Sequence, residues 1–236
     1  MKSRIAFMGE GSAGLTRKAV LSVILLVATL GILLFVSAGT VRFWQGWIFW
    51  VVASVAGSLL TFYLLQRDPS LLQRRLRYGP AAEKEWSQKI IQAVTNVLSM
   101  AEFAISGLDC RFRWSHLPAG IAVLGDLLVC VGYAWVFLVF RENSFASVAI
   151  EVQPGQRVIS TGPYRIVRHP MYTAMLLIVL ATPLALGSCW ALVCFPPVLL
   201  VVVWRLLREE KFLLRNLSGY DDFRRRTRWR LIPFGW

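Results

Sequence analysis

The chain has 236 residues, of which 56% are hydrophobic and 17% are charged, and its formal net charge is +13. This apolar content is above that of an ordinary soluble domain and indicates a membrane protein. The excess of Lys and Arg would suit a nucleic-acid-binding protein. Here, however, the basic residues are divided among several loops between apolar segments, which argues against that class of partner.

Several apolar runs are long enough to cross a hydrocarbon core of about 30 Å at roughly 1.5 Å per residue. We predict spans at residues 20–38, 46–65, 90–108, 118–140, 171–186 and 189–206. The third is the most polar, and the last two form either a tight hairpin or a pair with one re-entrant member. The predicted fold is an all-α integral membrane bundle of five to six transmembrane helices.

The placement of Lys and Arg predicts the orientation of this bundle. With a cytoplasmic N-terminus, 23 of the 26 basic residues lie on the cytoplasmic side, and only Arg42, Arg111 and Arg113 lie on the other. Cytoplasmic loops of membrane proteins carry such an excess. We therefore expect both termini to be cytoplasmic. The first apolar run is too long for a signal peptide and is expected to be an uncleaved anchor.

Three regions follow from this reading of the chain. Residues 1–19 are expected to be a polar, frayed cytoplasmic tail. Residues 20–140 hold the N-terminal helices and the loop 66–89, in which Asp68 and Pro69 predict the cap and first position of a short amphipathic helix. We interpret its arginines as membrane anchors rather than substrate contacts. Residues 141–236 are the expected catalytic region, and its first loop, 141–169, is a candidate lid.

Two acidic residues and the four cysteines lie in or near the predicted spans. Glu102 and Asp126 lie inside predicted spans, so each is expected to face the bundle interior or a headgroup region, in a functional role or in a helix–helix hydrogen bond. The four cysteines have no metal-ligand spacing, and we predict neither a metal site nor a disulfide.

A first candidate site lies at Arg168-His169-Pro170. A residue before proline avoids the α region, and proline suits the first helical position, so His169 is expected to cap the fifth span. The free N–H groups of a helix start, with Arg168 beside them, favour a carboxylate or phosphate, and Tyr172 can face the same ligand. The alternative is an ordinary interfacial helix start with no ligand.

A second candidate site is the pair Glu209-Glu210 near the end of the last span. The topology returns this pair to the membrane face that holds His169. A ligand with a cationic and an anionic end, such as S-adenosylmethionine, would find complementary groups there. The local alternative is that Arg205 and Glu209, four residues apart, simply pair on one helix.

These two segments resemble the paired signature of a known superfamily. TGPYRIVRHPMYT (161–173) and REEKFLLRNLSGYDDFRRRTRWRLIPF (208–234) are similar to motifs of the isoprenylcysteine carboxyl methyltransferases and phospholipid N-methyltransferases, which are integral membrane enzymes. EKEWSQK (83–89), GLDCRFRWS (107–115) and RENSFAS (141–147) also resemble a bacterial branch of that superfamily.

The resemblance implies an S-adenosylmethionine-dependent methyltransferase with a cytoplasm-facing cofactor pocket. The cofactor-binding residues that it implies are Tyr164, Arg168, His169, Pro170, Tyr172, Glu209 and Glu210. Two departures concern the pocket: Thr173 stands where the family often has Gly, and Phe223 where it often has Tyr.

The acceptor is expected to be lipophilic and to enter from the bilayer. A carboxylate acceptor could be held by Arg168, Arg205 or Arg228. A phospholipid amine would first lose a proton, with help from His169 or a glutamate. We name Arg168, His169 and Arg205 as candidate catalytic residues.

Two other classes of function compete with methyl transfer. A membrane reductase of the sterol-reductase type, which uses NADPH, has a similar C-terminal pattern, although this chain has no Gly-rich dinucleotide fingerprint. A non-enzymatic membrane scaffold or transporter predicts that no cofactor binds.

Overall fold

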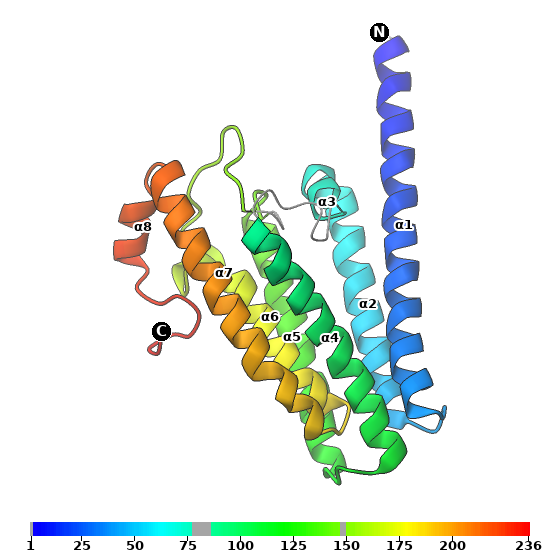
Figure 1. The fold of residues 1–236 in the computed structure, drawn as a ribbon. Coiled ribbons are helices and arrows are strands. Elements are labelled where there is room, and N and C mark those ends of the chain that lie inside the picture. The colour runs from blue at the N-terminus through cyan, green and yellow to red at the C-terminus, as the bar shows by residue number, and fades with distance from the viewer. Residues whose placement is uncertain (1, 77–85, 147–149) are drawn as a thin grey trace.

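The computed structural model describes residues 2–76, 86–146 and 150–236 and, within the first helix, the side chains from Ala13 onward. Over this part of the chain it contains helices and connecting loops without a strand (Figure 1). The long helices are α1 (Lys2–Ala38), α2 (Trp44–Arg67), α4 (Trp86–Phe112), α5 (Ala119–Glu142), α6 (Pro170–Ala185) and α7 (Phe195–Asn216). The short ones are α3 (Pro69–Leu76), η2 (Gly162–Arg165), η3 (Trp190–Cys194) and α8 (Tyr220–Arg226).

Five helical segments of the described chain are long and apolar enough to cross a membrane, and they make this an integral membrane protein. They are Ala13–Ala38, Trp44–Arg67, Trp86–Phe112, Ala119–Glu142 and Trp190–Asn216. The predicted fifth span, α6, has only 16 residues and rises about 24 Å. It is therefore shorter than the hydrocarbon core, which is about 30 Å thick. It forms a hairpin with η3 and α7, as one of the two sequence-based alternatives had it.

Small residues let the inner helices approach closely. α5 packs most extensively against α6, and two glycines one heptad apart face that contact. A Cβ added at Gly125 would lie 2.2 Å from the Ala185 backbone nitrogen, and one at Gly132 would lie 2.5 Å from Ile178 Cγ1. In lipid the hydrophobic effect does not drive helices together, so van der Waals contact between closely packed backbones contributes to holding α5 and α6 together.

Two expectations about the N-terminal half need correction. The predicted frayed tail is helical, because α1 begins at Lys2. The amphipathic helix is present as α3, and Asp68 caps it with an Oδ1 that accepts the Leu71 N–H at 2.9 Å. Its apolar side does not face lipid, however: Leu71 and Leu72 are buried against α1, α2 and α5. The predicted break at Gly79-Pro80 lies outside the described residues.

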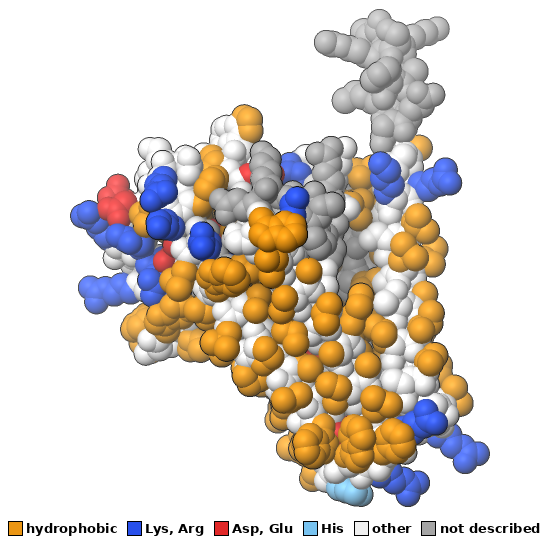
Figure 2. All heavy atoms as spheres, in the orientation of Figure 1, with side chains coloured by type: hydrophobic (Ala, Val, Ile, Leu, Met, Phe, Trp, Pro, Cys, Tyr) orange, Lys and Arg blue, Asp and Glu red, His pale blue; other side chains and the backbone are white. Residues whose placement is uncertain are grey.

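Charge and apolar surface divide the molecule into a middle band and two ends (Figure 2). Apolar side chains cover the middle, basic side chains gather around α8 and at the same end of α1, and a smaller basic group marks the opposite end. At that opposite end, Asp109 of α4 is buried and accepts hydrogen bonds from Ser115 Oγ at 2.6 Å and Ser188 Oγ at 2.5 Å. These bonds tie α4 to the turn between α6 and η3, and they give the segment 107–115 a structural role.

Glu102 and Asp126 both face the interior of the bundle. They are 2% and 6% exposed. Glu102 Oε1 and both Asp126 carboxylate oxygens have no hydrogen-bond partner among the described residues. Neither residue lines the cavity described next.

Candidate functional site

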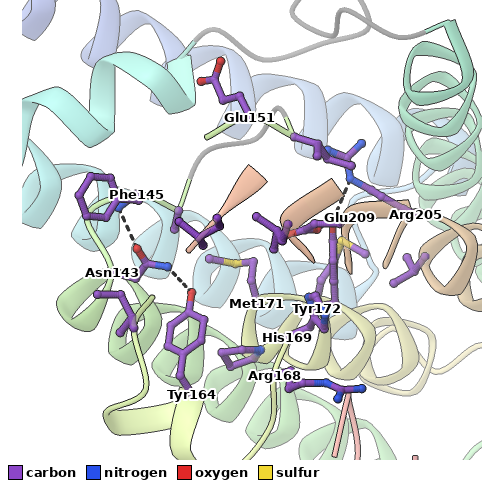
Figure 3. Close-up of a pocket in the computed structure, with 18 of the residues that line it drawn as sticks. Asn143, Phe145, Glu151, Tyr164, Arg168, His169, Met171, Tyr172, Arg205 and Glu209 are labelled. Carbon is purple, nitrogen blue, oxygen red and sulfur yellow. Dashed lines mark hydrogen bonds between the residues drawn. The ribbon is translucent and has the colours of Figure 1, made fainter. Parts of the chain in front are cut away.

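A cavity of about 430 Å³ opens among α3, α4, α6, α7, α8 and the loop after α5. This volume lies within the range of small-molecule sites, roughly 300–1,000 Å³. Figure 3 shows Tyr164, His169, Tyr172, Arg205 and Glu209 gathered around it from three separate segments. Of the seven predicted cofactor residues, six line the cavity: Tyr164, Arg168, His169, Pro170, Tyr172 and Glu209. The seventh, Glu210, does not line it.

The start of α6 has the predicted form. Pro170 is its first residue, and His169 occupies the cap position with φ −122° and ψ 62°. The His169 side chain makes no capping hydrogen bond; its ring instead stacks on Tyr172, with 5.8 Å between ring centroids. The first turn of α6 therefore keeps free N–H groups at the edge of the cavity, where Met171 and Tyr172 line it.

Glu210 is the centre of a buried charge cluster behind the cavity wall. Its Oε1 lies 2.9 Å from Arg168 Nε and 3.3 Å from His169 Nε2, and its Oε2 accepts a hydrogen bond from Arg230 Nε at 3.1 Å. The side chains of Glu210 and Arg168 are each 6% exposed. Glu210 thus holds two of the predicted site residues in place, and its contacts are to the protein.

Glu209 has a different set of contacts. Its Oε2 accepts a hydrogen bond of 2.6 Å from the Tyr172 hydroxyl, which in turn accepts one of 3.0 Å from Arg205 Nε. Arg205 also donates to Gln88 Oε1 of α4 at 3.1 Å. This chain of bonds crosses three helices and fixes Glu209, Tyr172 and Arg205 at the cavity wall.

Tyr164 lies on the other side of the cavity, on η2. Its hydroxyl oxygen accepts a hydrogen bond of 2.6 Å from Asn143 Nδ2. Burial raises the pKa of Tyr164 to about 12, because a phenolate would lose hydration there, although the bond from Asn143 acts in the opposite direction. The phenol therefore keeps its proton at neutral pH and can donate it to a ligand in a hydrogen bond.

The C-terminal tail forms part of the site's support, which the motif pattern did not predict. The N–H groups of Arg168 and His169 donate to the carbonyls of Trp229 and Arg230 at 2.9 and 3.0 Å. Thr173 Oγ1 donates to the Leu231 carbonyl at 2.8 Å. The departure from Gly at position 173 thus has a structural consequence, because the added hydroxyl anchors the tail to α6.

The loop after α5 covers one side of the cavity and is held by α3. Arg75 Nη1 donates to the Ala146 carbonyl at 2.9 Å, Arg74 donates to the Ser144 carbonyl, and Arg75 itself lines the cavity. The two arginines therefore hold this loop in place, a role that their interpretation as membrane anchors did not include. The cavity also contacts Ile150 and Ile159 of the predicted lid, whose residues 147–149 lie outside the described part of the chain.

Two aromatic residues of α8 complete the wall. Tyr220 and Phe223 are buried, 4% and 6% exposed, and both line the cavity. The Tyr220 hydroxyl has no hydrogen-bond partner among the described residues. From the sequence, only the missing hydroxyl at Phe223 was noted, and Tyr220 was not predicted as a site residue.

The lining fits a zwitterionic ligand with an apolar neighbour. Glu209 offers a carboxylate to a cationic group, Arg168 and the α6 start favour an anionic group, and the Tyr220 hydroxyl offers an unused polar atom. Ile91, Ile178, Val179 and Val202 form an apolar wall between α4, α6 and α7. Across the described residues, no group of three or more His, Cys, Asp or Glu side chains is arranged to hold a metal ion.

Comparison with known families agrees with this geometry. Residues 121–218 match the family described as phospholipid methyltransferase. This segment contains α6, α7, nearly all of α5, the motif 161–173 and the first part of the motif 208–234. This part of the chain is therefore similar to a phospholipid methyltransferase domain, as the resemblance predicted, and it lies in a membrane-spanning protein. Such a match supports membrane methyltransferase activity in general. No curated protein matches the chain.

Proposed function

We propose that the protein transfers a methyl group from S-adenosylmethionine to a lipophilic acceptor at the cytoplasmic face of a bacterial inner membrane. The observation that carries this proposal is the meeting of the α6 start and Glu209 in one cavity with an apolar wall. The clustering of basic residues at the cavity's end of the molecule supports a cytoplasmic site. Residues 141–236 supply most of the proposed catalytic region, joined by α3 and α4.

S-Adenosylmethionine supplies a methyl group on a sulfonium sulfur, so the protein's task is to bind, orient and exclude water. Glu209 is proposed to hold the cationic amino group, and Arg168 with the α6 start to hold the carboxylate. Arg205, bonded to Tyr172, fixes the orientation of Glu209. Glu210 is proposed to act through Arg168 and His169 rather than by contact with the cofactor.

The acceptor is proposed to approach along the apolar wall between α4, α6 and α7. A prenylcysteine-like carboxylate would be held by Arg205 or Arg168. A phospholipid amine would need to lose a proton, and Glu209 or His169 lies in the cavity to accept it. The chemistry of the wall is compatible with both acceptors.

Binding of S-adenosylhomocysteine and of NADPH to the detergent-solubilised protein, measured by isothermal titration calorimetry, tests the cofactor. We expect S-adenosylhomocysteine to bind and NADPH not to bind. The reverse result would favour a reductase, and no binding of either would favour a scaffold. Incubating membranes that contain the protein with a labelled methyl donor, followed by lipid mass spectrometry, then identifies the acceptor.

A further inference from the structure

Tyr220 is a buried residue whose hydroxyl is not explained by any interaction among the described residues. It is 4% exposed, it lines the cavity, and its hydroxyl has no hydrogen-bond partner among the described residues. Buried polar groups in folded proteins are nearly always paired, since an unpaired hydroxyl costs stability. The two other cavity tyrosines follow that rule, because Tyr164 bonds to Asn143 and Tyr172 bonds to Glu209 and Arg205.

The backbone directs Tyr220 into this position. Gly219 adopts φ +80°, a left-handed conformation that reverses the chain after α7, and the Tyr220 N–H then donates to the Leu217 carbonyl at 3.3 Å. The Tyr220 ring packs against Phe223, with 5.8 Å between centroids. These contacts hold the ring in the wall of the cavity, where its hydroxyl is buried.

The charges around Tyr220 indicate what kind of ligand group would meet it. Burial raises its pKa, and the nearby carboxylates of Glu210 and Glu209 raise it further, while Arg168 and Arg224 act in the opposite direction. The phenol therefore stays protonated at neutral pH and is a hydrogen-bond donor. Next to Arg168, such a donor suits an oxygen acceptor with negative charge.

We propose that Tyr220 is a further ligand-binding residue, which donates a hydrogen bond to the carboxylate of S-adenosylmethionine. This inference rests on the proposed function. In this arrangement Glu209 of α7 holds the ammonium group of the cofactor. Tyr220 of α8 and Arg168, just before α6, hold its carboxylate.

The substitution Tyr220→Phe tests the proposal, because it removes only the hydroxyl. In the unliganded protein the loss of an unpaired buried hydroxyl should leave the melting temperature unchanged or raise it. The affinity for S-adenosylhomocysteine should fall about ten- to a hundredfold, as for a lost bond to a charged acceptor. The affinity for 5′-methylthioadenosine, which lacks the amino-acid group, should stay the same.

Tyr133→Phe is the matched control, since Tyr133 is a partly buried tyrosine of α5 that does not line the cavity. It should leave both affinities unchanged. Unchanged binding of S-adenosylhomocysteine by Tyr220→Phe would overturn the proposal, and so would equal weakening of both ligands. If the wild-type protein binds neither ligand, the proposed function itself fails, and the assignment of Tyr220 fails with it.

Discussion

Two adjacent glutamates, Glu209 and Glu210, have different surroundings although they are neighbours in sequence. Glu209 lines the cavity and bonds to Tyr172. Glu210 lies behind the wall among Arg168, His169 and Arg230. On a helix, successive residues point about 100° apart, so one faces the cavity and the other faces the tail.

We expect Glu209→Gln and Glu210→Gln to fail in different ways. Glu209→Gln should weaken S-adenosylhomocysteine binding at least tenfold with little loss of stability. Glu210→Gln should lower the unfolding free energy by about 3–5 kcal/mol, because it leaves buried cations without their counter-charge. Calorimetric titration and thermal unfolding in the same detergent separate the two effects. Equal loss of affinity with unchanged stability in both variants would contradict this division.

Arg168 is expected to need its planar guanidinium. Arg168→Ala should reduce methyl transfer about ten- to a hundredfold, and Arg168→Lys should restore it only in part, because an ammonium cannot present the same fork to a carboxylate. His169→Ala should also reduce transfer, since the ring stacks on Tyr172 and contacts Glu210. A radiolabelled methyl-transfer assay measures the activity of the three variants, and size-exclusion chromatography checks that each is folded. Full activity in both alanine variants would remove the α6 start from the active site.

At the scale of elements, α3 connects the second span to the cavity. Asp68 caps this helix, and its arginines hold the loop at Ser144 and Ala146. Burial raises the pKa of Asp68, but hydrogen bonds from Ser70 and the Leu71 N–H outweigh this effect and leave the pKa below its usual value. The ionised carboxylate is therefore the form that stabilises the fold.

The lowered pKa of Asp68 predicts a dependence of stability on pH. Because the folded pKa lies below the unfolded one, the contribution of Asp68 is complete above the unfolded value, 3.8, and is lost as the pH falls through the folded value. Asp68→Ala should cost about 1 kcal/mol at pH 7. Thermal unfolding from pH 7 to pH 3 should show the difference between wild type and variant shrinking at the acid end. A difference that does not change with pH would exclude a charged cap.

At the scale of the whole molecule, the helices fix which segments share a face. α3 and α8 lie at one end of the bundle, and the C-terminal end of α4 lies at the other (Figure 1). The cavity contacts α3 and α8, whereas Asp109, near the end of α4, bonds to Ser115 and Ser188. The uneven distribution of basic residues predicts that the cavity end is cytoplasmic.

Single cysteines in a cysteine-free background test this orientation. Ser3→Cys and Ser218→Cys should react with a membrane-impermeant thiol reagent only from the cytoplasmic side. Arg42→Cys, in the loop between α1 and α2, is the control and should react only from the opposite side. Protection of Ser3→Cys or Ser218→Cys from the cytoplasmic reagent would reject the predicted topology.

Local sequence patterns determined much of this protein. Long apolar runs predict the spans, because a bilayer leaves a chain few alternatives to helices. Pro170 predicts the start of α6, and Asp68-Pro69 predicts the start of α3, because both signals act on the adjacent backbone. The motifs around His169 and Glu209 identified six of the residues that line the cavity, since each motif keeps its residues near one helix end.

Only the tertiary structure decided how these pieces share their contacts. Glu210 turns away from the cavity because Arg230 of the tail and Arg168 compensate its charge there. Arg74 and Arg75 bind loop carbonyls some 70 residues away in the sequence. Tyr220 reaches the cavity because the chain reverses at Gly219. Each of these facts depends on which distant segment packs beside a residue, and a local pattern of charge or hydrophobicity does not contain that information.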